Sequence, residues 1–254
     1  MELEKLLRTR LASKKILLMT HIVLGYPSMA VNRQVVAQMV KGGVDCIEMQ
    51  IPFSEPMADG PIILKANQES LASGTKVADC LAFAAEMTAA YDIPFLFMTY
   101  YNIIFKYGEE KFFQECRNAG ITGLIVPDLP PEMGKNFFNL ATQYQIAPVL
   151  IFAPTSTTAR MQQLSSVAAG FIYCVARRGV TGKQSEFGED FFTYLAKCRA
   201  ATQLPLAVGF GIRSKEDVAA ITGKADMAVI GSETIRLVDA EGPQAVGPFI
   251  AGLR

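Results

Sequence analysis

The stretch "EEKFFQECRNAGITGLIV" (residues 109–126) contains the unit on which the fold prediction depends. Its first part is apolar at helical spacing, and Gly120 closes it as a helix C-cap. Its last part, residues 121–126, is short, apolar and β-branched, as in a buried strand. The stretch therefore predicts a helix, a turn and a strand in direct succession.

The same unit recurs along the chain, with helical patterns such as residues 29–43 between short apolar runs. The eight runs are residues 16–24, 44–49, 93–100, 121–126, 146–152, 170–175, 204–210 and 225–230. Runs that are almost continuously apolar are typical of parallel strands covered on both faces. Eight such units in 254 residues predict an α/β fold, a (β/α)₈ TIM barrel forming a single domain over residues 1–254.

A doubly wound open sheet is the alternative architecture. The even spacing of the runs, the absence of a linker and the absence of GxGxxG after the first run favour the barrel. Residues 1–15 predict an additional short amphipathic helix at the N-terminus. A further short helix is predicted after the eighth strand, where "GSETIRLV" (231–238) begins with glycine and serine.

Composition excludes several classes of function. The formal net charge is zero, so there is no basic excess for binding nucleic acid or an anionic membrane surface. No apolar run approaches the ~20 residues that span a bilayer, and the N-terminus lacks the apolar core of a signal peptide. The five cysteines are odd in number and form no CxxC, which predicts buried, reduced thiols in a cytoplasmic protein.

In a TIM barrel, the chemistry lies at the carboxyl ends of the strands. The candidates there are His21, Glu48, Tyr100, Asp128, Tyr173 and the glycines near 209–211 and 231. The chain has one histidine, which excludes a metal site built from several histidines. A lone histidine near a strand end is more often packed than catalytic. No lysine lies within the eight runs, which argues against a Schiff base.

Two acids in "DCIEMQIPFSEPMADGPII" (45–63) are the strongest candidates. Glu48 ends an apolar run, where a charge costs several kcal/mol unless it is paired or neutralised. A structural ion pair and an acid–base role both explain it. Asp59 lies in "ADGP", where an aspartate can be a turn residue or a second carboxylate of the same pocket.

A phosphate site is predicted after the seventh and eighth strands, where barrels of this kind gather such sites. Backbone N–H groups of Gly211, Gly231 and Ser232 could bind a phosphate there. The polar, glycine-bearing segment 178–190 predicts a closing lid, with a surface loop as the alternative.

With these features in place, the sequence resembles the alpha subunit family of tryptophan synthase. The resemblance runs along the whole chain and rests on four motifs in the family's order. These are the "E-x-x-x-PFS-[DE]-P-x-ADGP" segment at Glu48–Pro61, "GVTG" (179–182), "GFGI" (209–212) and "GS" (231–232). It implies a lyase that cleaves indole-3-glycerol phosphate to indole and D-glyceraldehyde 3-phosphate by a retro-aldol reaction, without metal or Schiff base. It also implies a pyridoxal-phosphate-dependent beta subunit as partner in an αββα tetramer, with no cofactor on this chain.

The resemblance also assigns roles to residues. Glu48 is the expected general acid–base, and Asp59 is expected to hold the indole N–H. The expected substrate-binding residues are Tyr173, Tyr100, Ile151, Thr181, Gly182, Phe210, Gly211, Gly231, Ser232 and His21.

The chain departs from the family pattern at four positions: His21 for the usual Phe of the indole pocket, Tyr26 for an acid, Glu55 for Asp, and Leu64 for Gln. We expect His21 to alter ring recognition or the pH profile, and Glu55 to alter contacts with the beta subunit. Two other functions stay open. One is a non-catalytic allosteric activator of a beta subunit, and the other is a different phosphosugar barrel such as an epimerase or isomerase.

Overall fold

Eight parallel strands close into a barrel in the order of the sequence. The computed structural model describes residues 1–175, 188–209 and 211–254. The strands are β1 (Leu17–Val23), β2 (Cys46–Gln50), β3 (Phe95–Met98), β4 (Gly123–Ile125), β5 (Ala147–Phe152), β6 (Ile172–Val175), β7 (Leu206–Gly209) and β8 (Met227–Ile230). Strand β1 pairs with both β2 and β8. The predicted barrel is confirmed, and the open-sheet alternative is wrong.

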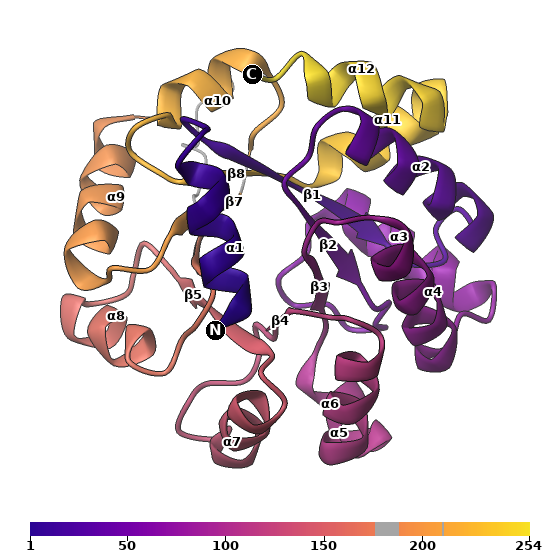
Figure 1. Cartoon of the computed structure of the whole chain (residues 1–254), viewed down its shortest axis with the longest axis horizontal. Coiled ribbons are helices and arrows are strands. Elements are labelled where there is room, and N and C mark those ends of the chain that lie inside the picture. Colours follow the sequence, from indigo (N-terminus) through magenta and orange to yellow (C-terminus); the bar gives the residue numbers. More distant parts are fainter. Residues whose placement is uncertain (176–187, 210) are drawn as a thin grey trace.

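Helices form a ring around the strands, and α1 crosses in front of them (Figure 1). The helices are α1 (Glu2–Leu11), α2 (Met29–Lys41), α3 (Pro61–Ala72), α4 (Val77–Ala90), α5 (Tyr101–Tyr107), α6 (Glu109–Asn118), α7 (Lys135–Gln143), α8 (Thr158–Ser165), α9 (Glu189–Ala201), α10 (Lys215–Ile221), α11 (Ser232–Glu241), the 3₁₀ turn η1 (Pro243–Ala245) and α12 (Val246–Ala251). The predicted N-terminal helix and the helix after the eighth strand are both present. In the described part of the chain, no helix combines the length and apolar character needed to cross a bilayer.

Helix α6 and strand β4 form the unit that the stretch 109–126 predicted. The helix buries Phe112, Phe113 and Cys116, and Gly120 follows with φ +74°, a backbone conformation that glycine adopts easily. Strand β4 covers only the middle of the run 121–126, although Ile121 and Val126 are also buried. An apolar run therefore predicted burial correctly but overestimated the length of the hydrogen-bonded strand.

The strands separate an outer from an inner apolar layer. Along β1, Leu18 and Ile22 belong to the cluster packed against the helices, while Leu17 and Met19 belong to the cluster inside the barrel. Because side chains alternate along a strand, His21 continues the inward series. On β2, inward Cys46 and outward Ile47 place Glu48 and Gln50 inside the barrel by the same argument.

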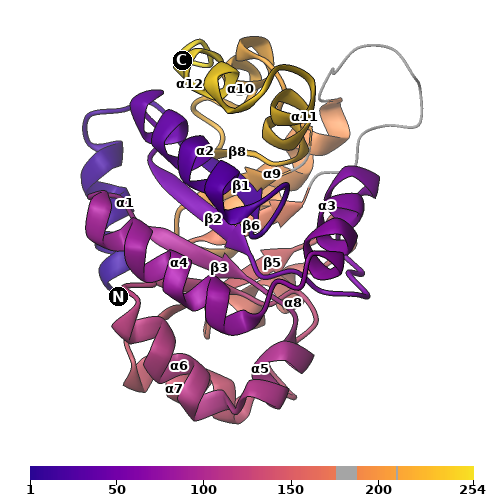
Figure 2. The ribbon, with the colours of Figure 1, turned by 90° about the vertical axis from the view of Figure 1, so that its right-hand side faces the viewer.

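Helix α1 closes the amino-terminal end of the barrel. Its Leu3 and Leu7 are fully buried in the inner cluster. A Cβ on Gly170, two residues before β6, would lie 2.7 Å from Leu3 Cδ2, so this helix packs tightly against the starts of the strands. Figure 2 shows α1 at one end of the barrel and α3 near the other. The loops that follow the strands are thus left to form a site at the carboxyl-terminal end.

Leu7→Ala should lower the free energy of unfolding by about 2–5 kcal/mol, because it leaves a cavity under the barrel. Leu6→Ala is a matched control on the same helix, since Leu6 is 36% exposed, and it should change stability by less than about 0.5 kcal/mol. Urea unfolding followed by circular dichroism measures both. Equal effects of the two substitutions would contradict the closing role of α1.

Candidate active site

Glu48 lies inside the barrel near the carboxyl-terminal end of β2. All five residues of this strand are buried, and Glu48 is 4% exposed. His21 on β1 is its direct neighbour in the parallel register. His21 Nδ1 lies 3.2 Å from Glu48 Oε1, which forms a buried ion pair when the imidazole is protonated. Glu48 Oε2 is buried and has no hydrogen-bond partner in the described part of the chain.

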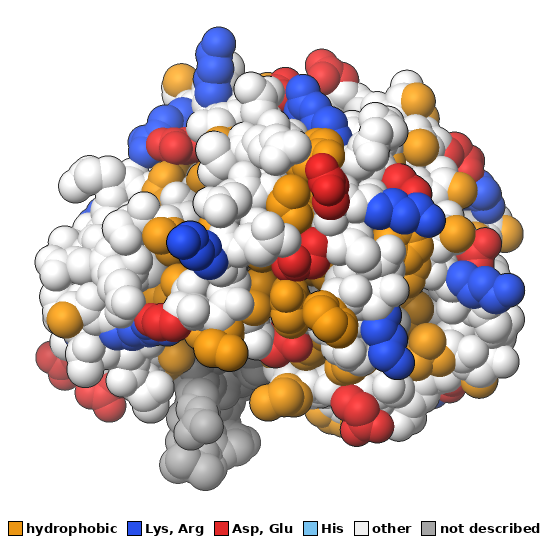
Figure 3. Space-filling model, turned by 90° about the horizontal axis from the view of Figure 1, so that it is seen from below, with side chains coloured by type: hydrophobic (Ala, Val, Ile, Leu, Met, Phe, Trp, Pro, Cys, Tyr) orange, Lys and Arg blue, Asp and Glu red, His pale blue; other side chains and the backbone are white. Residues whose placement is uncertain are grey.

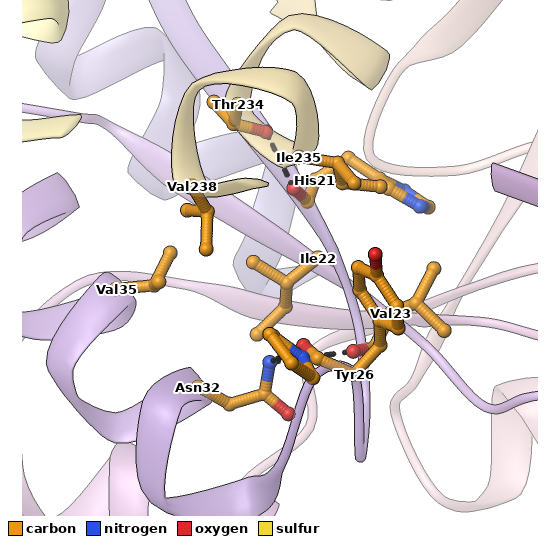
Figure 4. Close-up of a pocket in the computed structure, with 10 residues that line it drawn as sticks. His21, Ile22, Val23, Tyr26, Asn32, Val35, Thr234, Ile235 and Val238 are labelled. Atoms are coloured by element: carbon orange, nitrogen blue, oxygen red, sulfur yellow. Dashed lines mark hydrogen bonds between the residues drawn. The ribbon is translucent and has the colours of Figure 1, made fainter. Parts of the chain in front are cut away.

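The imidazole of His21 points away from the outer side of β1. Figure 4 shows its ring directed away from Val35 and Val238, and its backbone carbonyl accepting a hydrogen bond from Thr234 Oγ1 at 3.0 Å. Burial lowers the pKa of His21, but the negative charges of Glu48 and Asp59 outweigh burial and raise its pKa above the ordinary value. The protonated imidazole is therefore favoured by its surroundings.

Asp59 is brought to the same end of the barrel by the loop after β2. Gln50 Nε2 donates to Asp59 Oδ2 at 2.6 Å, and Asn67 Nδ2 on α3 lies 3.4 Å from the same oxygen. Burial and the charge of Glu48 raise the pKa of Asp59, against the opposing effects of Gln50 and His21. The charge of Glu48 therefore acts on Asp59.

Two predicted tyrosines lie beside the carboxylates. Tyr100 Oη accepts a hydrogen bond from the backbone N–H of Ala58 at 3.0 Å, next to Asp59. Its ring stacks on Phe53 with centroids 4.9 Å apart. The pKa of Tyr173 is raised well above its ordinary value by burial and by the charges of Glu48 and Asp59. Burial also raises the pKa of Tyr100, so both phenols are neutral near pH 7.

Tyr173 occupies space that only a glycine on β7 leaves open. A Cβ on Gly209 would lie 2.2 Å from the Oη and Cε1 atoms of Tyr173. Ile151 on β5 is the register neighbour of Tyr173 and packs against the inner apolar cluster. Ile151 and the two tyrosines therefore form an apolar and aromatic wall on the inner side of the barrel.

The predicted phosphate residues fall partly within the described chain. Gly231 precedes α11 and Ser232 is its first residue, and a Cβ on Gly231 would meet nothing within 4 Å. Gly211 has φ +86°. Thr181, Gly182, Phe210 and residues 178–187 of the predicted lid lie outside the described residues.

The sequence analysis did not single out the polar residues Glu233 and Gln50, and it named as a candidate Asp128, which has a structural role instead. Glu233 lies in the first turn of α11, with Oε2 3.8 Å from Arg213 Nε and 3.3 Å from Arg236 Nη1. Gln50 was also missed, although an amide two residues after Glu48 in an apolar strand is a detectable signal. Asp128, a candidate from its position, instead accepts the Tyr101 backbone N–H at 2.9 Å, at the start of α5.

Tyr26, which stands where the family pattern has an acid, forms hydrogen bonds with residues of two helices. Its hydroxyl donates to Asp239 Oδ1 at 3.0 Å and accepts from Lys65 Nζ at 3.3 Å. The loop after β1 is thereby connected to α3 and α11.

A small cavity of about 20 Å³ lies between β1, α2 and α11 (Figure 4). It has room for about one water molecule and lies on the outer side of β1. It is therefore not the pocket for a substrate. In the described residues, no three or more His, Cys, Asp and Glu side chains are grouped so that they could hold a metal ion. The five cysteines are free and buried, as predicted.

The fold and site define a (β/α)₈ barrel with a pair of carboxylates at the carboxyl ends of its strands. Residues 7–246 match the family model described as "Tryptophan synthase alpha chain". The chain is 71% identical over 254 residues to the tryptophan synthase alpha chain of Desulfotalea psychrophila, with both chains fully covered. The chain belongs to the tryptophan synthase alpha chain family.

Solved structures agree with this assignment. Tryptophan synthase subunit alpha from Legionella pneumophila superposes with a TM-score of 0.90 at 28% identity, covering 99% of this chain and 96% of that one. A chain of the tryptophan synthase complex from Pyrococcus furiosus gives 0.85 at 26% identity, covering 93% and 96%. The barrel is therefore the architecture found in this family.

Gly209→Ala should destabilise the protein by about 1–3 kcal/mol, because the added methyl group overlaps the ring of Tyr173. Gly60→Ala is the control, since a Cβ there meets nothing within 4 Å and its φ of −77° suits alanine. Urea denaturation compares the two variants with the wild type. If Gly209→Ala lost no more stability than Gly60→Ala, the ring of Tyr173 would not require a glycine at position 209.

Proposed function

We propose that the chain catalyses the cleavage of indole-3-glycerol phosphate to indole and D-glyceraldehyde 3-phosphate, with Glu48 and Asp59 as catalytic residues. This is the lyase half-reaction of tryptophan synthase in L-tryptophan biosynthesis. The observation that carries the proposal is the pair of interacting carboxylates inside the mouth of the barrel, one of which has a buried oxygen without a partner. Membership of the family supports the same reaction.

The two carboxylates suffice for the bond cleavage. Glu48 gives a proton to indole C3, and the positive charge that develops on the ring nitrogen is stabilised by Asp59. Glu48, now a carboxylate, takes the proton of the neighbouring glycerol hydroxyl. The carbon–carbon bond breaks, its electron pair returns to the ring, and the hydroxyl carbon becomes the aldehyde. Glu48 ends protonated as it began, so the reaction needs no other reactant.

The remaining assigned residues would bind the two ends of the substrate. Tyr100, Tyr173 and Ile151 supply a wall for the indole ring, with His21 beside it. The phosphate would bind at the N-terminus of α11, where helix N–H groups favour an anion. The residues assigned to it are Gly182, Phe210, Gly211, Gly231 and Ser232, and Thr181 would contact Asp59 when the lid closes.

The partner would be a beta subunit in an αββα tetramer, seated on the loops after β2, β3 and β4. Met57, Phe105 and Met133 follow these three strands in turn and are 87%, 65% and 76% exposed. Figure 3 shows hydrophobic side chains gathered in the middle of one face, among charges of both signs. Exposed apolar side chains near a site often mark a protein interface, and Glu55 lies in the same loop as Met57.

Three further expectations complete the proposal. The chain would work without a cofactor of its own, since pyridoxal phosphate belongs to the beta subunit. Residues 1–254 would fold as a single domain. The protein would act in the cytoplasm, as its five free thiols suggest.

Glu48→Gln should lower indole formation by at least about 10²-fold, because the amide can neither give nor take the proton. Asp59→Asn should also be severely impaired, since it removes the charge beside the ring nitrogen. The measurement is indole release from indole-3-glycerol phosphate, and circular dichroism checks that each variant is folded. Near-normal turnover in Glu48→Gln would refute the mechanism.

The same assay separates the enzyme from a non-catalytic activator. The purified chain should release indole when it is assayed by itself, and it should release indole faster when a beta subunit is present. Absence of indole in both conditions, together with stimulation of the beta subunit, would favour the activator.

Met57→Asp should weaken binding to a beta subunit at least tenfold, because it places a charge on an apolar contact. Val167→Asp is the matched control, since Val167 is 39% exposed and precedes β6, at the opposite end of the barrel. Calorimetric titration with the beta subunit measures both affinities. Equal affinities of the two variants would place the interface elsewhere.

A further inference from the structure

We propose that His21 is a positioning residue that holds Glu48 Oε1 as an imidazolium and thereby presents Oε2 to the substrate. The proposal rests on the acid–base role of Glu48. It adds a functional partner for that residue, at a position where the family resemblance leads one to expect phenylalanine. A phenyl ring can neither donate a hydrogen bond to a carboxylate nor carry a charge.

The geometry of the pair carries the proposal. His21 and Glu48 are register neighbours on β1 and β2, and each is 4% exposed. The 3.2 Å contact joins His21 Nδ1 to one carboxylate oxygen only. The other oxygen, Oε2, is buried without a partner in the described chain, and so is His21 Nε2. A buried polar atom without a partner is costly, and a bound ligand can remove that cost.

The charges around the imidazole favour its protonated form. The charged groups that act on it are Glu48 on β2 and Asp59 in the loop after β2, with the neutral amide of Gln50 beside them. The charge of Glu48 also acts on the phenol of Tyr173 on β6 and on the thiol of Cys46 on β2, and burial raises the pKa of both groups. Both are therefore neutral near pH 7, and within the described residues the charge of His21 offsets the two carboxylates.

The contact has two separable consequences. The N–H of the imidazole fixes the orientation of the carboxylate, so that one oxygen performs both proton transfers. In the step in which Glu48 is a carboxylate and takes the glycerol proton, the charge of the imidazolium keeps the pocket from holding two uncompensated anions. Because the pKa of His21 in the folded protein is raised, the pair stabilises the fold fully below about pH 6.5. This contribution is lost as the pH rises through the folded-state pKa.

The chain offers a direct test, because His21 is its one histidine. In the protein without a histidine tag, the NMR signals of a single imidazole report its titration. We expect a midpoint above about 6.5 in the wild type and a lower midpoint in Glu48→Gln. A midpoint at or below that value, unchanged in Glu48→Gln, would overturn the proposal. This readout does not require turnover, so it stands apart from the test of the proposed function.

Kinetics separate the two consequences. His21→Phe removes both the donor and the charge, and we expect kcat to fall about tenfold, as for a lost hydrogen bond to a charged group, with little change in KM. His21→Gln keeps a donor and should restore kcat toward the wild type. We expect kcat/KM of the wild type to decline above the NMR midpoint, and both variants should lose this decline.

Ile22→Val provides the control on the same strand, since Ile22 faces the outer layer. It should keep the wild-type kcat and pH profile. If His21→Phe matched this control in kcat and in pH profile, His21 would be a packing residue and the proposal would fail.

Discussion

The in-register parallel pairing of β1 with β2 is the constraint on which the site depends. It places His21 opposite Glu48, and the inward direction of both follows from the alternation that sends Met19 and Cys46 into the core. The barrel is closed, so neither side chain can turn to solvent at a sheet edge. The imidazole and the carboxylate can be buried there because they lie 3.2 Å apart and can form an ion pair. A shift of one residue in register would bury two isolated charges instead, at a cost of several kcal/mol.

The second carboxylate is positioned by neutral groups. The amide of Gln50 donates to Asp59, and the hydroxyl of Tyr100 accepts from the backbone N–H of the neighbouring Ala58. Groups near the ends of β2 and β3 therefore fix the position of the loop after β2. Among the described residues, the buried polar atoms left without a partner include Glu48 Oε2, His21 Nε2 and Gln50 Oε1. These three come from two adjacent strands. Their concentration at one place is what a substrate site shows before its ligand is bound.

Much of this could be predicted from sequence, for identifiable reasons. Periodicity and glycine signals gave all eight strands, because apolar runs report burial directly. Glu48 and Asp59 stood out because acids are costly in such surroundings. The contact of His21 with Glu48 was missed, since it depends on a register between two strands that the chain pattern does not encode. Gln50 was missed because an amide carries no charge penalty, although its place two residues after Glu48, on the same face of the strand, was a usable signal. The roles assigned to the site residues remain predictions from resemblance, and Thr181, Gly182 and Phe210 also lie outside the described residues.

The distribution of charge explains how one pocket can hold two acids and still accept a phosphorylated substrate. At the strand ends, the proposed imidazolium of His21 would offset part of the charge of Glu48 and Asp59, and the phenol of Tyr173, whose pKa is raised, stays neutral. The phosphate would bind away from them, at the N-terminus of α11, where Glu233 is already paired with two arginines. Negative charge on the substrate would then be separated from Glu48, which is proposed to move the proton, and from Asp59, which is proposed to stabilise the ring. The ring, which becomes positive during cleavage, would lie between the acids that stabilise it.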